Sequence, residues 1–156
     1  MSLLLIERQY SPSVAAARHA SSLDAIYNQV KTALLNTALP DALKKIGLRY
    51  FLDGTALHAE LHGYRLVERY DHVWLRDGLP IPRLGGRSRF FIRSQDGQEG
   101  DEVVRLIWDS SGNISIGKQD GYFAHVDDDG EARSFVRNAS LALANAVHAK
   151  MDIIGD

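Results

Sequence analysis

LRYFLDGTALHAELHGYRLVERYDHVWL, residues 48–75, is the stretch that decides the fold. Apolar and polar side chains alternate along much of it, which is the period-two pattern of a β-strand with one buried face. Asp53-Gly54 is a two-residue hairpin signal, and Gly63 indicates a second turn or a bulge. The stretch therefore predicts consecutive antiparallel strands joined by short turns.

The segment before this stretch has helical periodicity. We predict a short strand over 3–8, a break at Ser11-Pro12, and a helix over about 22–38. A serine caps this helix, and Asp24 lies in its first turn, where the helix dipole favours a carboxylate. Pro40 ends the helix, because proline disfavours helical geometry in the residue before it.

The segment after the stretch contains more strands and a second helix. The predicted strands cover 89–94, 102–109, 114–116 and 122–126, with turns of glycine, asparagine and aspartate between them. An acidic run of three aspartates precedes the helix over about 131–152, where carboxylates complement the positive end of a helix.

The order of elements predicts an α+β fold and one domain over residues 1–156. A twisted antiparallel sheet of about five to seven strands carries the N-terminal and the C-terminal helix on one face. The opposite face is then solvated, paired with a second subunit as a homodimer, or curved around a cavity.

Composition excludes several classes of protein. The chain has 156 residues and no cysteine, which excludes a disulfide framework, a zinc ribbon, a cysteine nucleophile and an iron–sulfur site. It contains no run of about 18 apolar residues and no secretory signal, so we predict a cytoplasmic protein without a membrane span. No nucleotide-binding motif is present, and we predict no cofactor.

Charge is distributed unevenly along the chain. Residues 65–93 carry seven arginines and three acidic residues, a formal charge of +4, whereas residues 94–131 carry ten acidic residues against Arg105 and Lys118, a charge of −8. Either the two stretches neutralise each other as neighbouring strands and loops, or the basic one binds an anionic partner.

Residues 76–88, RDGLPIPRLGGRS, are predicted to form a loop, because two prolines and three glycines disfavour a regular element. Guanidinium groups bind carboxylate or phosphate through two hydrogen bonds, and arginine mixed with apolar residues is typical of protein interfaces. Nucleic acid is disfavoured by the net charge of −2 and the absence of a binding motif. The candidate partner-binding residues are Arg76, Leu79, Ile81, Arg83, Leu84, Arg87, Arg89 and Arg93.

His58, Glu60 and His62 are weaker candidates, for a metal site. Alternation along a strand places all three on one face. Residues four apart on a strand are separated by about 13 Å, however, so one ion cannot bind both histidines unless the strand bulges. The string His58-Ala59-Glu60 also occurs in zinc-dependent deaminases, but that chemistry needs cysteine ligands.

Other carboxylate–imidazole pairs lack a nucleophile at a recognisable spacing. Asp71 and His72 are neighbours on a strand and point to opposite faces, whereas His125 and Asp127 can share a face.

We therefore predict a non-enzymatic protein-binding or adaptor module that uses the basic loop and the exposed sheet face. The alternatives are a protein that binds an apolar small molecule between the sheet and the C-terminal helix, as helix-grip folds do, and a metal-dependent enzyme that uses the 58–62 strand.

Overall fold

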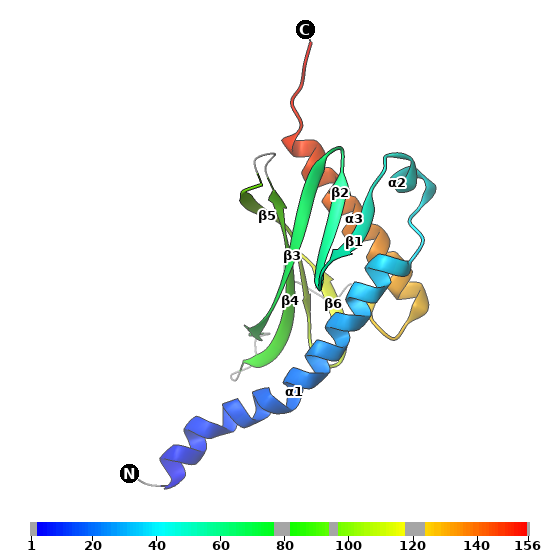
Figure 1. Cartoon of the computed structure of the whole chain (residues 1–156). Helices are drawn as coiled ribbons and strands as arrows, with labels where there is room; N and C mark the ends of the chain where they lie inside the picture. The colour runs from blue at the N-terminus through cyan, green and yellow to red at the C-terminus, as the bar shows by residue number, and fades with distance from the viewer. Residues whose placement is uncertain (1–2, 77–81, 94–96, 118–123, 156) are drawn as a thin grey trace.

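A computed structural model describes residues 3–76, 82–93, 97–117 and 124–155 of the chain (Figure 1). Two helices come first, seven strands follow, and a long helix ends the order. The helices are α1 (Leu3–Asn36), α2 (Asp41–Lys45) and α3 (Asp129–Lys150). The strands are β1 (Arg49–Asp53), β2 (Ala56–Leu61), β3 (Tyr64–Leu75), β4 (Arg83–Arg93), β5 (Glu99–Trp108), β6 (Asn113–Ile116) and β7 (Ala124–His125).

The seven strands form one antiparallel sheet in the order β1 to β7, so each strand pairs with its neighbour in the chain. The sheet curls around α1 and α3, which pack on the same face (Figure 1). This arrangement confirms the predicted α+β fold. The core lies between the helices and this face, and among its fully buried side chains are Leu23, Leu34, Leu57, Leu66, Phe90, Leu106, Trp108, Phe135 and Leu143.

Helix α1 is longer than predicted, and the strand over 3–8 is wrong. One helix runs through Ser11-Pro12 and through the serine predicted as a cap, so Asp24 lies inside the helix. The alanine-rich segment after Pro12 has high helix propensity and continues the helix towards the N-terminus. In Figure 1 this part of α1 extends beyond the sheet.

Carboxylates stand at the start of α3, as predicted, and two of them also accept backbone hydrogen bonds. The Asp128 carboxylate accepts a hydrogen bond from the Glu131 backbone N–H at 2.9 Å. The Glu131 carboxylate accepts one from the His125 backbone N–H at 2.8 Å, which ties the helix to β7. Asp129 and Glu131 lie in the first turn, where they complement the helix dipole.

The predicted loop over 76–88 is wrong from Arg83 onward, because β4 begins there and pairs with β3. Residues 77–81 lie outside the described part of the chain. Gly85 and Gly86 belong to the strand. A Cβ atom on Gly86 would lie 2.2 Å from Nε1 of Trp108, and one on Gly85 would lie 2.5 Å from Cδ1 of Leu75. The two glycines thus permit close side-chain packing, and neither serves a turn.

We predict that Gly86→Ala destabilises the protein by about 1–3 kcal/mol or more, because the added methyl group overlaps the buried indole of Trp108. Urea denaturation measures the change. Gly130→Ala in α3 is the matched control, since its new Cβ atom would meet only Asp128 Oδ1, at 3.4 Å. The control should be neutral or gain about 0.5 kcal/mol. Equal losses in both variants would contradict the packing role of Gly86.

Candidate functional site

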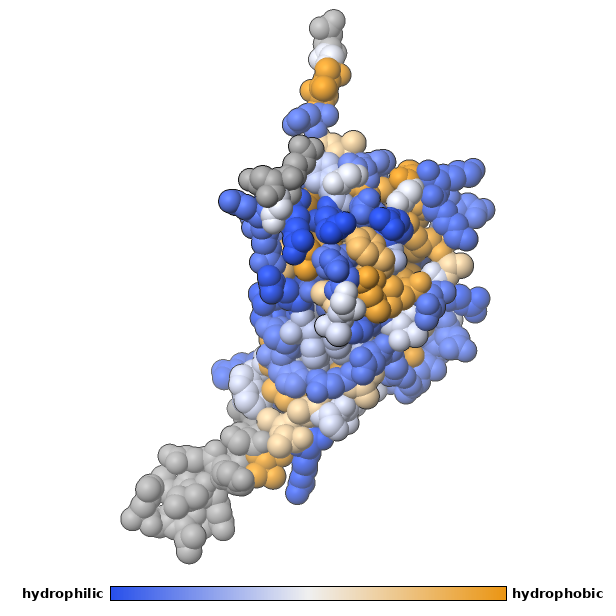
Figure 2. All heavy atoms as spheres, in the orientation of Figure 1, coloured by the Kyte–Doolittle hydropathy of each residue, from blue (hydrophilic) through white to orange (hydrophobic). Residues whose placement is uncertain are grey.

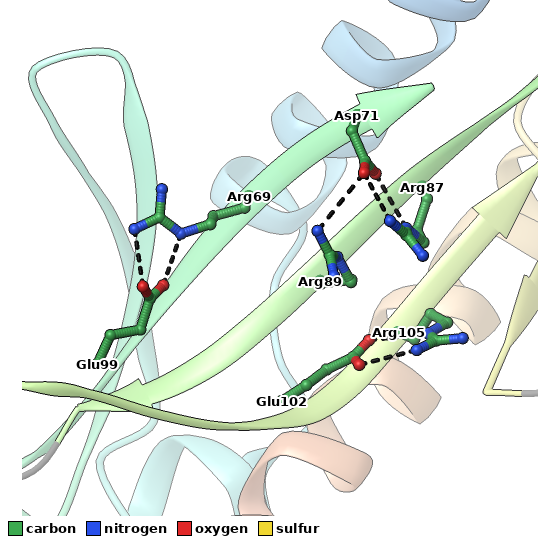
Figure 3. Close-up of polar contacts among 7 residues, drawn as sticks. All are labelled: Arg69, Asp71, Arg87, Arg89, Glu99, Glu102 and Arg105. Carbon is green, nitrogen blue, oxygen red and sulfur yellow. Dashed lines mark hydrogen bonds and ion pairs between the residues drawn. The ribbon is translucent and has the colours of Figure 1, made fainter. Parts of the chain in front are cut away.

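The candidate site is the face of the sheet opposite α1 and α3, called the outer face below. Along β4, Ser88, Phe90 and Ile92 point towards the helices and are buried. The alternate residues Arg87, Arg89, Phe91 and Arg93 therefore lie on the outer face, and Figure 3 shows Arg87 and Arg89 with Asp71 there.

The remaining predicted residues of the basic segment are spread out. Arg76 follows β3 and is exposed, and Arg83 is exposed at the start of β4. Leu84 is half-buried and packs against the core. Leu79 and Ile81 lie outside the described residues. Of the predicted set, the structure brings Arg87, Arg89 and Arg93 together on one face.

Three bidentate ion pairs cross the outer face (Figure 3). Arg87 donates to both carboxylate oxygens of Asp71, at 2.9 and 2.6 Å. Arg105 binds Glu102 at 2.8 Å through both contacts. Arg69 binds Glu99 at 2.6 and 2.9 Å. Of these three pairs, Arg69–Glu99 joins the basic stretch 65–93 to the acidic stretch 94–131, whereas Asp71 and Arg87 both belong to the basic stretch and Glu102 and Arg105 to the acidic one.

Arg89 is less well compensated than Arg69, Arg87 and Arg105. Its nearest carboxylate oxygen is Oδ2 of Asp71, at 3.4 Å, and the same oxygen binds Arg87 at 2.6 Å. Its Nε atom is buried and has no hydrogen-bond acceptor in the described part of the chain. Its guanidinium lies 5.3 Å from the centre of the Phe91 ring. One carboxylate therefore serves two guanidinium groups, and the Arg87 hydrogen bond, with the nearby positive charges, lowers the pKa of Asp71.

The same imbalance recurs across β1 to β3. Arg49 and Arg65 share the Glu60 carboxylate, at 3.0 and 3.8 Å. Both guanidinium groups lie over the Phe51 ring, 4.7 and 5.3 Å from its centre. In Figure 2, hydrophilic atoms cover much of the visible surface and surround a smaller group of apolar atoms.

We call this surface the arginine face. It has more arginines than carboxylates among the described residues, and two phenylalanine rings lie beside the cations. Its arginines are Arg49, Arg65, Arg69, Arg87, Arg89, Arg93 and Arg105, and its carboxylates are Asp53, Glu60, Asp71, Glu99 and Glu102.

The predicted metal candidates do not share one face. His58 is buried, stacks on Phe51 with ring centres 5.4 Å apart, and has its pKa lowered chiefly by burial. Glu60 is bound to Arg49. His62 lies beyond the end of β2, in the turn before β3, and contacts His148 of α3. Within the described residues, no group of three or more His, Cys, Asp or Glu side chains could hold a metal ion.

A second polar cluster lies on the helix side of the sheet, and sequence reasoning missed it. Asp24 Oδ1 accepts a hydrogen bond from Tyr70 at 2.6 Å and lies 2.9 Å from Nε2 of His72. Asp71 and His72 thus point to opposite faces, as predicted. Tyr70 and His72 are 46 and 48 residues from Asp24 in the sequence, so only a predicted contact between α1 and β3 could have revealed this cluster.

Glu68 is buried in the same region. Tyr27 donates a hydrogen bond of 2.5 Å to Glu68 Oε1, and the Tyr27 ring stacks on Tyr70 with centres 4.0 Å apart. Glu68 Oε2 and Ser88 Oγ are buried and lack a hydrogen-bond partner among the described residues. Burial raises the pKa of Glu68, because it disfavours the ionised form more than the Tyr27 hydrogen bond favours it.

The hollows near the helices bear on the apolar-ligand hypothesis. A cavity of about 20 Å³ lies between α1, β6, β7 and α3, and Ile114, Ala124 and Phe135 are among the residues that line it. A hollow of about 330 Å³ lies where β6 ends beside β5, with Val104, Ile116 and Ala142 in its wall, and it is open to solvent. A third, of about 710 Å³, is an open groove between α1 and α3 with both polar and apolar residues in its lining, among them Gln29, Val126 and Arg133.

No family model, curated protein or solved structure matches this chain. No helix in the described ranges is long and apolar enough to cross a membrane.

We predict that Asp71→Asn destabilises the protein by about 1–2 kcal/mol at neutral pH, allowing for solvent screening at partly exposed charges. The substitution removes the anion that Arg87 and Arg89 share. The folded pKa of Asp71 is lowered, so its contribution is complete above the unfolded pKa of about 3.9 and is lost as the pH falls through the folded pKa.

The difference between the wild type and Asp71→Asn should therefore shrink in acid, as measured by urea denaturation over a pH series. Asp101→Asn is the control, because Asp101 is 81% exposed and its ion pair with Lys150, at 3.2 Å, lies at the surface. Its effect should stay below about 0.5 kcal/mol. A loss of stability in Asp71→Asn no larger than that of the control would contradict the role of Asp71 as the stabilising anion shared by Arg87 and Arg89.

Glu68→Gln should have the opposite dependence on pH. The raised folded pKa means that the wild type loses stability as the pH rises from the unfolded value of about 4.3 through the folded value. Glutamine does not ionise, accepts from Tyr27, and can donate to the unpaired Ser88 Oγ. We expect the variant to equal or exceed the wild type in stability at neutral pH.

Urea denaturation at acidic and neutral pH tests whether Glu68→Gln raises or lowers the free energy of unfolding. Glu102→Gln is the comparison, because hydrogen bonding to Arg105 lowers the pKa of Glu102. A Glu68→Gln variant that is clearly less stable than the wild type at neutral pH would show that the ionised carboxylate stabilises the fold.

Proposed function

We propose that this chain is a non-enzymatic protein-binding module whose arginine face binds an acidic segment of a partner protein. The observation that carries the proposal is the sharing of carboxylates. Arg89 shares Asp71 with Arg87, and Arg49 shares Glu60 with Arg65. A carboxylate from a partner would supply the acceptor that these guanidinium groups lack within the face.

The arrangement on the sheet suits an interface. The arginines stand on paired strands, so their spacing is held by backbone hydrogen bonds. Phe51 and Phe91 add flat apolar surface beneath the cations, and arginine with aromatic residues is enriched among the residues that dominate binding energy. Charge complementarity would raise the rate of association and make it sensitive to salt.

The charge of the face supports a partner other than a second copy of this chain. A symmetric homodimer through this surface would bring two copies of the same net-positive patch together, which costs free energy. Nucleic acid is disfavoured, because the whole chain is acidic with a net charge of −2 and five carboxylates interrupt the face. The apolar-ligand alternative needs an enclosed chamber, whereas the hollow of about 330 Å³ is open.

The test uses a labelled glutamate-rich peptide as the probe and fluorescence anisotropy as the measurement. Arg89→Gln combined with Arg65→Gln removes two cations that share acceptors, and both variant side chains keep a polar group. We expect the wild type to bind the peptide with an affinity that falls as salt rises, and the double variant to lose at least about tenfold, or 1.4 kcal/mol.

Arg137→Gln is the matched control, because Arg137 is exposed on α3, away from the arginine face. It should bind the peptide as the wild type does. A second variant, Arg93→Gln, guards against misfolding of the double variant. The proposal fails if all four proteins bind the peptide equally, or if a single-stranded oligonucleotide binds the wild type more tightly than the peptide does.

A further inference from the structure

Two histidines from distant parts of the chain meet at one end of the molecule. His62 lies in the turn between β2 and β3, and His148 lies in the last turn of α3. Their Nε2 atoms are 3.2 Å apart, and their ring centres are 5.2 Å apart. Both side chains are exposed, so the nitrogen pair can be reached from solvent. Figure 1 shows this turn beside the C-terminal end of α3.

The backbone of the turn holds His62 in this place. Leu61 pairs with Tyr64, so His62 and Gly63 are the two central residues of the hairpin. Both have positive φ, at 51° and 79°, and His62 is the one residue other than glycine with positive φ in the described structure. This hairpin geometry favours Asn-Gly or Gly-Gly. Histidine adds nothing to the turn that asparagine would not, so its imidazole calls for another explanation.

The separation of the two nitrogens suits a shared metal ion. Imidazole nitrogens bind zinc at about 2.0–2.1 Å, and two ligands at a tetrahedral angle are then about 3.3–3.4 Å apart. The observed 3.2 Å between the Nε2 atoms is close to that value. With both Nε2 atoms in the unprotonated tautomer, rotation of the rings would turn both lone pairs towards one ion, and water would complete the coordination in this open position.

The neighbouring charges permit a cation. Lys150 lies two residues beyond His148, and its ammonium group is bound to Asp101 at 3.2 Å, so its charge is compensated. The hydroxyl of Tyr64 donates to the Lys150 backbone carbonyl at 3.4 Å, which fastens the hairpin to the same helix end. The C-terminal end of a helix also favours positive charge.

We propose that His62 and His148 form a two-histidine site for a divalent transition metal, with imidazole nitrogen as the protein ligand. The bound ion joins the β2–β3 turn to the C-terminal end of α3. This site lies apart from Arg89 and the centre of the arginine face, and it does not depend on the proposed function. It replaces the set His58, Glu60 and His62 that the sequence pattern suggested.

The test is titration of the full chain with Cu²⁺, Ni²⁺ and Zn²⁺, followed by calorimetry and by the shift in thermal midpoint. We expect saturable binding of one ion per chain, tightest for Cu²⁺ as the order of divalent metals with nitrogen ligands requires. Binding should raise the thermal midpoint and should be lost in acid, because the imidazoles must be neutral to bind metal.

Two variants separate the metal role from a structural one. His62→Asn keeps a residue that the turn favours, and His148→Ala keeps a good helix former, so both proteins should fold without metal. Each should lose the midpoint shift and the saturable binding. His19→Ala and His125→Ala, which alter histidines elsewhere on the chain, should retain both. Binding that persists in His62→Asn, or no binding by the wild type, would overturn the proposal and leave only a hydrogen bond between two imidazoles.

Discussion

The packing of Trp108 between the sheet and α1 is the constraint on which the rest of the structure depends. The indole is fully buried, and its Nε1 donates a hydrogen bond of 3.3 Å to the Leu23 carbonyl of α1. Gly86 on β4 leaves the space that the indole occupies. Tyr27 and Tyr70 lie parallel to it, with ring centres 6.2 and 5.6 Å away. These contacts fix the position of α1 relative to the central strands of the sheet.

This packing separates the two faces of β3 and β4 chemically. On the helix side, Glu68 and Ser88 are buried, and the pKa of Glu68 is raised. On the outer face, Asp71 and Arg87 remain partly exposed, and the pKa of Asp71 is lowered. Successive residues of a strand point to opposite faces, so the two environments lie on either side of the same strands. The acidic side chain buried on one side is thus unavailable to neutralise the arginines on the other, which is why the outer face keeps an excess of guanidinium groups.

The fold could be predicted from the sequence to the level of class, number of strands and neighbouring order, because these depend on local periodicity and short turns. The hairpins at Asp53-Gly54 and Gly63 and the capped start of α3 are such features. The errors have one cause. Local propensity favours a loop at Gly85 and Gly86 and a break at Pro12, because it cannot anticipate a bulky indole across the sheet or the length of a helix.

The sequence by itself determined the period-two alternation of the strands and the charge contrast between residues 65–93 and 94–131. Only the tertiary structure decided which carboxylates those arginines share, that Asp24 meets Tyr70 and His72, and that His62 meets His148. The physical reason is sequence separation. A side chain's direction follows from the period of its own element. The shared carboxylates depend on how the strands pair, with Asp71 opposite Arg87. The contacts of Asp24 with Tyr70 and of His62 with His148, 46 and 86 positions apart, require the helices to be docked on the curled sheet.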